Sequence, residues 1–232
     1  ASSCEMREKG TFVDSKIAIR GSSGLMGSKL TAHLEEQMRG FNIGALAKST
    51  IGHFITVGIG AAMESRFRYR FFSPAKILSN ADIQPGQKVL EVGCGTGFFS
   101  LTAARLIGDQ GLLVAMDILP ESVELVAKKA QAAGLRNVQV VKGDALNTHL
   151  EGGGFDAIML FGVIPAPMLP LARLLPEMSR LLKPTGILTV WPPIPGWLPQ
   201  SILKSNLFTY ASKRKGVYNF RRSMQVKTGE RP

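Results

Sequence analysis

Apolar and polar positions alternate in two different periods along the chain after residue 74. Short apolar runs are followed by longer segments in which apolar residues recur every three or four positions. The short runs are typical of strands buried on both faces, and the longer segments are typical of helices that cover a sheet. The pattern therefore predicts an α/β domain with a parallel sheet.

The predicted elements follow one another in strict alternation up to residue 191. Strands are expected at 88–92, 111–117, 137–144, 155–162 and 186–191. Helices are expected at 98–108, at 120–134, at 168–183 with a bend at Pro170 or Pro176, and at 198–205. Apolar segments at 207–212 and 216–222, with the basic residues KRK between them, predict a closing hairpin. The expected fold is a doubly wound, seven-stranded, mostly parallel sheet with helices on both faces and a C-terminal antiparallel hairpin.

Composition divides the chain into four expected segments. Residues 1–28 are interpreted as a flexible leader or as residues added for expression, and residues 29–76 as an N-terminal helical extension that acts as a lid. Residues 77–222 hold the α/β domain, and residues 223–232 form a polar tail. The apolar run at 51–63 has thirteen residues, which is too short to span a bilayer.

Positive charge is concentrated at the two ends of the chain. The formal net charge is +11, yet residues 77–197 hold nine Lys and Arg against ten Asp and Glu, whereas residues 198–232 hold eight against one. Basic ends suit contact with RNA or with an anionic membrane surface. Cys4 and Cys94 lie far apart, so no disulfide framework is expected and a reducing, cytoplasmic location is predicted.

Three glycines follow the first predicted strand within five positions, Gly93, Gly95 and Gly97. Glycine accepts positive φ angles and lets a ligand approach the backbone, and the next helix begins with free N–H groups. A dinucleotide fingerprint would need a third glycine where this chain has Phe98 or Ser100, and no Gly-Lys-Ser/Thr of a P-loop follows. The glycines therefore predict a site for a nucleoside that is not a dinucleotide.

The segment LEVGCGTG (90–97), with an acid at the end of the next strand, resembles the first motif of the class I (Rossmann-like) S-adenosylmethionine-dependent methyltransferases. The acid, Asp117, occupies the place where that family binds both ribose hydroxyls. Asp144, in VKGDA, occupies the place where the family binds the adenine amine. RLLKPTGIL (180–188) is similar to the family's turn before strand five, with Thr185 in place of a glycine. The pattern is most similar to the small "type 11" branch, the ubiquinone and menaquinone methyltransferase-like enzymes, and some stretches also resemble isoaspartyl protein and tRNA adenine methyltransferases.

The resemblance assigns residues 77–222 to an S-adenosylmethionine-binding domain and implies a set of cofactor contacts. They are Glu91, Gly93, Cys94, Gly95, Thr96, Gly97, Asp117, Ile118, Asp144, Ala145, Phe161 and Gly162. Ile118 is expected to pack on the adenine, and Cys94 is interpreted as a small filler rather than a nucleophile. Two interpretations stay open for Glu91, which either supports the loop or holds the cofactor's amino group indirectly. Phe161 is either a core residue or a wall of the site.

The implied reaction transfers a methyl group to a small-molecule acceptor by in-line displacement and leaves S-adenosylhomocysteine. Such a displacement depends mainly on alignment, so no catalytic residue is assigned, and no metal site is predicted. Acceptor contacts are expected from Phe71, Phe72, Trp191 and Trp197. The alternative is an enzyme that acts on RNA, protein or phospholipid, whose basic ends bind RNA or attach it peripherally to a membrane. The N-terminal helices are also candidates for forming a homo-oligomer.

Overall fold

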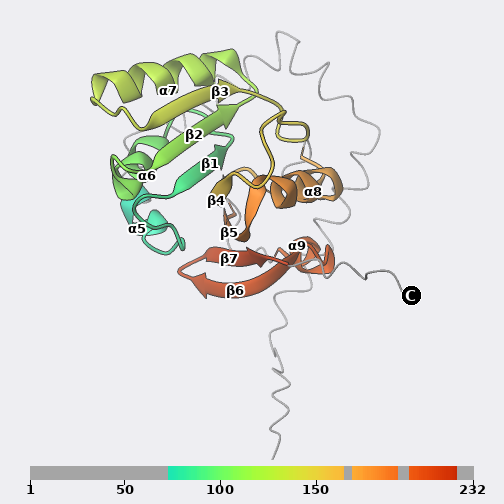
Figure 1. The fold of residues 1–232 in the computed structure, drawn as a ribbon. Coiled ribbons are helices and arrows are strands. Elements are labelled where there is room, and N and C mark those ends of the chain that lie inside the picture. Colours follow the sequence, from blue (N-terminus) through green and yellow to red (C-terminus); the bar gives the residue numbers. More distant parts are fainter. Residues whose placement is uncertain (1–72, 165–168, 193–198, 224–232) are drawn as a thin grey trace, which may run out of the picture.

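The computed structural model describes residues 73–164, 169–192 and 199–223. Within them lies one seven-stranded sheet with the order β3-β2-β1-β4-β5-β7-β6 (Figure 1). The strands are Lys88–Val92 (β1), Leu112–Asp117 (β2), Val138–Lys142 (β3), Phe155–Phe161 (β4), Leu182–Trp191 (β5), Phe208–Arg214 (β6) and Val217–Arg222 (β7). The helices are Pro74–Leu78 (α5), Ser100–Ile107 (α6), Pro120–Ala132 (α7), Leu171–Leu181 (α8) and Gln200–Lys204 (α9). The expected leader and most of the helical extension lie outside these residues.

The first five strands are parallel, as predicted, and the direction of winding reverses beside β1. This strand pairs with β2 on one side and with β4 on the other. The chain reaches β3 beyond β2, and later reaches β5 beyond β4. In open α/β sheets, ligands bind outside the carboxyl ends of the strands at such a reversal. The glycine loop leaves the carboxyl end of β1 and therefore lies at this position.

Helices cover both faces of the sheet, because successive strand residues point to opposite faces. Leu90 of β1 belongs to a buried cluster that includes Leu174 of α8. Its neighbour Val89 belongs to a second cluster that includes Ala103 of α6 and Val126 of α7. Helices α5, α6 and α7 thus pack on one face, and α8 and α9 pack on the other (Figure 1).

The C-terminal hairpin is confirmed, with β7 antiparallel to both β5 and β6. Its turn is tighter than expected. Lys215 and Gly216 both have positive φ angles, 44° and 86°, as in the two-residue turns that match the twist of a hairpin. Lys213 and Arg214, which were expected in the turn, instead extend β6.

The boundary between α8 and β5 differs from the expected turn. β5 begins at Leu182, which pairs with Phe155, and the next pair along β4 is Ala157 with Ile187. Residues 183–186 therefore bulge out of the ladder, where Pro184 has no N–H to contribute. The helix itself begins after Pro170, its N-cap, so the predicted start at residue 168 was two to three residues early.

Candidate functional site at the carboxyl ends of the strands

The glycine loop requires residues without a Cβ atom. Gly93, Gly95 and Gly97 have φ angles of 72°, 52° and 82°, in the left-handed region that favours glycine. A Cβ atom on Gly93 would lie 2.4 Å from Cγ1 of Val163, the second residue after β4. The N–H groups of Gly93 and Cys94 both donate to the Met116 carbonyl, at 2.8 and 3.0 Å. The loop is therefore fixed between the ends of β2 and β4.

Asp117, the last residue of β2, lies beside this loop and is largely buried. Its Oδ2 accepts a hydrogen bond from Gly95 N at 2.8 Å, and its Oδ1 accepts one from Leu119 N at 3.0 Å. Each carboxylate oxygen has a second lone pair, so the group can also accept two neighbouring hydroxyl donors. The next residue, Ile118, is 59% exposed and presents an apolar surface. These features fit a nucleoside, with sugar hydroxyls on Asp117 and a base against Ile118.

Glu91 lies beneath the loop, in the interior of the sheet. Its Oε2 accepts a hydrogen bond from Ser100 Oγ at 2.6 Å, so the carboxyl joins β1 to the first residue of α6. Burial, reinforced by the charge of Asp117, raises the pKa of Glu91 to about 8, although the Ser100 hydrogen bond opposes the shift. This geometry supports the structural interpretation of Glu91.

Glu91→Gln is expected to reduce the pH dependence of stability. Between the pKa of an unfolded glutamate, about 4.3, and the folded value of about 8, the folded chain keeps a proton that the unfolded chain loses. The wild-type free energy of unfolding therefore falls as the pH rises through this window, by at most about 1.4 kcal/mol per pH unit. Glutamine keeps an acceptor for Ser100 and cannot ionise. Urea unfolding at pH 5.5 and pH 8 measures the difference.

The matched control for this experiment is Glu151→Gln, since Glu151 is an exposed glutamate. Its pH profile should follow that of the wild type. A Glu91→Gln profile that also follows the wild type would show that the Glu91 carboxyl is already ionised in the folded chain at pH 5.5.

Cys94 and Thr96, the residues between the glycines, are held by different contacts. Cys94 is 5% exposed, and burial raises the pKa of its thiol, which disfavours the nucleophilic thiolate. The Thr96 carbonyl accepts a hydrogen bond from Nζ of Lys129 at 2.9 Å, which ties α7 to the loop. Lys129 was not expected at the site, because its place in α7 is typical of a solvated helix face.

Three aromatic rings meet at the ends of β4 and β5, where Phe99, the N-cap of α6, lies against them. The Phe99 ring lies 5.1 Å from the ring of Phe161 and 5.7 Å from that of Trp191, both edge to face. Phe161 is only 5% exposed and belongs to a core cluster, which favours the first of its two interpretations. Gly162 N donates to the Trp191 carbonyl at 2.8 Å, and a Cβ atom on Gly162 would meet no other atom within 4 Å.

Asp144 and Ala145 follow the end of β3. Gly143 N donates to the Asp117 carbonyl at 2.9 Å, so the backbone joins this segment to the end of β2. Asp144 is exposed, and its Oδ1 accepts a hydrogen bond from Leu146 N at 2.8 Å. Ala145 is buried. Each strand end thus contacts the next one in the order β3, β2, β1, β4 and β5. The expected site residues from Asp144 to Trp191 therefore lie along one edge of the sheet.

The remaining expected acceptor residues, Phe71, Phe72 and Trp197, lie outside the described residues. Within 73–164, 169–192 and 199–223, no three His, Cys, Asp or Glu side chains group as a metal site would require. No helix in the same ranges has both the length and the apolar character needed to cross a bilayer.

The model of a family described as "Methyltransferase domain" matches residues 83–223. A demethylmenaquinone methyltransferase of Bacillus cereus is 32% identical over 106 residues, which are 45% of this chain and 44% of that protein. The matched region thus spans less than half the length of the curated relative.

Two solved structures share the fold. A SAM-dependent methyltransferase from Aquifex aeolicus superimposes with a TM-score of 0.61 at 24% identity, over 71% of this chain and 96% of that one. The [4+2]-cyclase SpnF superimposes with a TM-score of 0.50 at 23% identity, over 60% and 57% of the two chains.

Proposed function

This chain belongs to the class I S-adenosylmethionine-dependent methyltransferase family, and from that premise we propose that it methylates a small, apolar or aromatic molecule. The observation that carries the proposal is the glycine loop with Asp117 and Ile118 beside it, at the point where the winding of the sheet reverses. A fold by itself does not establish an activity, as the cyclase of similar fold illustrates.

The residues of this site suit the cofactor part by part. Asp117 would accept the ribose hydroxyls, Ile118 would cover the adenine, and the backbone of residues 93–97 would lie along the methionine portion. When bound, S-adenosylmethionine supplies an activated methyl group on a positively charged sulfur. The protein's part is to align the acceptor with that methyl group and to exclude water, and alignment alone can supply about 7 to 11 kcal/mol of the barrier in well-oriented reactions.

The chemistry around the ends of β4 and β5 supports an apolar or aromatic acceptor. Trp191 is half-buried beside Phe99, and Val163 packs over Gly93, so these side chains offer apolar surface next to the loop. The relative from Bacillus cereus is named for a quinone acceptor, demethylmenaquinone. We extend that class of acceptor, an aromatic ring with an apolar character, to this chain.

The test is transfer of a labelled methyl group from S-adenosylmethionine to a cell lysate separated into lipid-soluble, RNA, protein and water-soluble fractions. The proposal expects label in a small molecule of the lipid-soluble fraction, and none when the enzyme is first denatured. Label confined to RNA or protein would contradict the proposed acceptor class, and an absence of label in every fraction would contradict methyl transfer itself.

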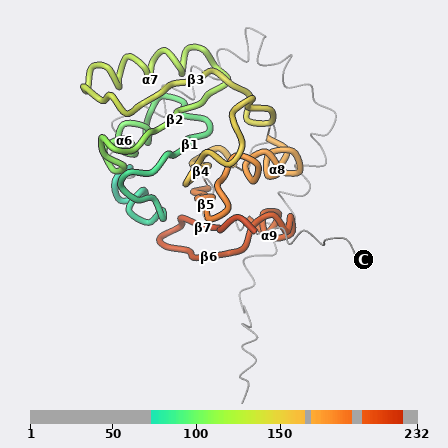
Figure 2. Tube along the Cα trace, in the orientation of Figure 1, coloured from blue at the N-terminus to red at the C-terminus, as the bar shows by residue number. Residues whose placement is uncertain are grey.

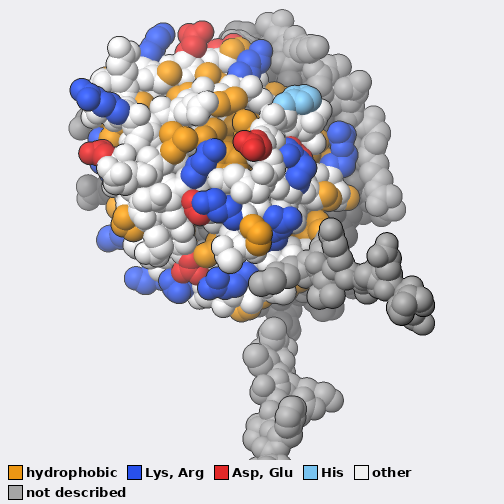
Figure 3. All heavy atoms as spheres, viewed as in Figure 1, with side chains coloured by type: hydrophobic (Ala, Val, Ile, Leu, Met, Phe, Trp, Pro, Cys, Tyr) orange, Lys and Arg blue, Asp and Glu red, His pale blue; other side chains and the backbone are white. Residues whose placement is uncertain are grey.

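A second candidate, action on phospholipid or RNA, is favoured by the charge of the C-terminal hairpin. Residues 199–223 hold six Lys and Arg and no Asp or Glu, and Figure 3 shows basic side chains along the lower edge of the molecule, where Figure 1 draws β6 and β7. Leu203 and Tyr210 are 42% and 54% exposed in the same segment. Turnover that falls steeply between low and moderate salt would favour this candidate, because contacts with phosphates are screened. Turnover of a small molecule should change little.

A further inference from the structure

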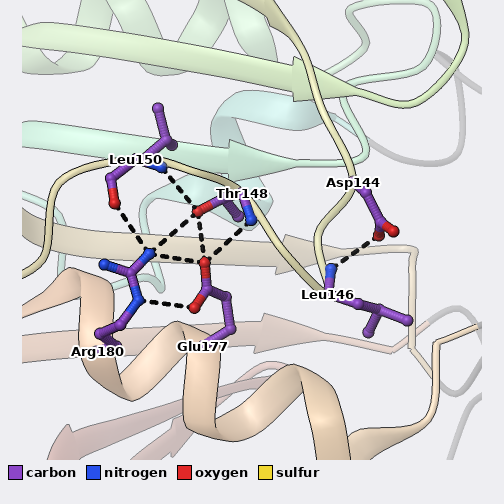
Figure 4. Close-up of polar contacts among 6 residues, drawn as sticks. All are labelled: Asp144, Leu146, Thr148, Leu150, Glu177 and Arg180. Atoms are coloured by element: carbon purple, nitrogen blue, oxygen red, sulfur yellow. Dashed lines mark hydrogen bonds and ion pairs between the residues drawn. The ribbon is translucent and has the colours of Figure 1, made fainter.

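The β3–β4 loop, residues 143–154, is fastened to α8 by a network of polar side chains to which the proposed reaction gives no role. Glu177 lies at its centre (Figure 4). Its Oε1 accepts hydrogen bonds from Thr148 N at 3.0 Å and from Thr148 Oγ1 at 2.6 Å. Arg180, one turn further along α8, donates from Nε to Glu177 Oε2 at 2.8 Å and from Nη2 to Oε1 at 2.7 Å. Both carboxylate oxygens are thus engaged, and they hold the loop and the arginine together.

Arg180 fastens the same loop at two more positions. Its Nη2 donates to the Leu150 carbonyl at 2.9 Å, and its own carbonyl accepts a hydrogen bond from Gly153 N at 2.9 Å. The trace in Figure 2 shows the chain passing from β3 across to α8 before it enters β4. One turn of α8 therefore fixes the loop at residues 148, 150 and 153.

The loop is held in a strained conformation between two of these anchors. His149 has a φ angle of 55°, in the left-handed region, which costs a histidine free energy. Such a residue persists where its surroundings determine the conformation. The His149 side chain is exposed, so apolar burial does not explain its conformation. The hydrogen bonds that hold Thr148 and Leu150, on either side of His149, explain it.

Two hydrogen-bonded turns join Asp144 to the fixed part of the loop. Its Oδ1 accepts a hydrogen bond from Leu146 N at 2.8 Å, and its carbonyl accepts one from Asn147 N at 3.0 Å. Asn147 directly precedes Thr148, where the network begins. A shift of Thr148 relative to α8 would therefore displace the Asp144 carboxylate.

We propose that Glu177 and Arg180 are positioning residues that hold Asp144 where its carboxylate selects the base of the cofactor. This inference rests on the proposed function and on the expectation from the family resemblance that Asp144 accepts the adenine amine. Glu177 forms hydrogen bonds with the loop and with Arg180, not with Asp144. It would therefore act on base selectivity indirectly, through the conformation of the loop that carries Asp144. The hydrogen bond from Arg180 lowers the pKa of Glu177 to about 2, so the network keeps its charges throughout the neutral range and the selectivity should not depend on pH there.

The experiment compares, by calorimetry, the binding of S-adenosylhomocysteine with that of S-inosylhomocysteine, in which a carbonyl replaces the adenine amine. A carboxylate that accepts the amine should make the wild type prefer adenine by about tenfold or more. Glu177→Ala is expected to lose most of this preference. Thr148→Val removes the hydroxyl that donates to Glu177 and accepts from Leu150 N and Arg180 Nη2 but keeps the Thr148 N–H bond to Glu177, so it should lose part of the preference. Arg173→Gln is the matched control, because Arg173 is an exposed arginine on the same helix, and it should keep the wild-type ratio.

Thermal unfolding identifies the variants that remain folded, and the binding ratio is compared among those. A wild-type ratio in a folded Glu177→Ala or Thr148→Val protein overturns the inference and leaves the proposed function standing. The inference is also overturned if the wild-type protein binds both ligands with equal affinity. If the wild type binds neither ligand, the proposed function itself fails.

Discussion

Gly93→Ala is expected to weaken the binding of S-adenosylhomocysteine by about 100-fold or more and to lower stability. An alanine in the left-handed region costs roughly 1–2 kcal/mol, and its Cβ atom would lie 2.4 Å from Cγ1 of Val163. Either the loop or the segment after β4 must then move, and both border the predicted methionine site. The strain lowers stability, whereas displacement of the site lowers affinity, and a loss of about 1.4 kcal/mol in binding free energy corresponds to a tenfold change. Calorimetric titration measures the loss of affinity, and thermal unfolding measures the loss of stability.

Gly134→Ala separates backbone strain from displacement of the site. Gly134 has a φ angle of 66° just after α7, and a Cβ atom there would meet nothing within 4 Å. This variant should lose stability and keep its affinity. The double variant Gly93→Ala/Val163→Ala removes the closest contact and should recover part of the lost affinity. Equal affinity losses in the single and double variants would mean that the clash with Val163 is not the cause.

Asp117→Asn is expected to weaken the binding of S-adenosylhomocysteine by roughly 100-fold, because each hydrogen bond to a charged group contributes about 1.5–3 kcal/mol. The amide would also turn an N–H₂ group toward Gly95 N or Leu119 N, both of which are donors. The loss should appear in ligand affinity far more than in the denaturant midpoint. Titration of the folded variant measures it.

Asp109→Asn is the matched control for Asp117, because Asp109 is an exposed aspartate in the turn before the opposite end of β2. It should bind the ligand as the wild type does. An Asp117→Asn protein that keeps wild-type affinity would remove the carboxylate from the cofactor site and would contradict the assignment of the ribose hydroxyls to it.

The sequence predicts the fold well because its signals are local. Apolar runs, the glycine spacing and an acid at the end of β2 each lie within one strand–loop–helix unit, and the structure forms those units in the expected order. The expectations for Glu91 and Phe161 stayed open because burial decides between them. Burial depends on which residues of α6 and β5 arrive beside them, and local sequence does not encode that.

The contacts that sequence reasoning missed join residues far apart in the chain. Val163 packs on Gly93 because β4 lies next to β1, and Glu177 meets Thr148 because α8 crosses the β3–β4 loop. A lone valine after a strand and a Glu–Arg pair three residues apart on a helix are common in any α/β protein. The bulge at 183–186 was missed for a similar reason, since it depends on how Phe155 and Leu182 pair.

The outer strand of the hairpin also bears on how copies of this protein meet. An antiparallel edge strand offers unpaired backbone groups on which another chain can add a strand and begin an aggregate. Along β6 the register shifts between Tyr210 and Ser212, and the strand ends in the exposed cation Lys213 and in Arg214, whose Nη1 lies 2.9 Å from Oδ1 of Asp82. Two such edges paired in parallel would place the Lys213 side chains side by side, and in either direction they would meet over an irregular ladder. Within the part of the chain that the structure describes, the outer strand of the hairpin thus carries two features that disfavour edge-to-edge aggregation.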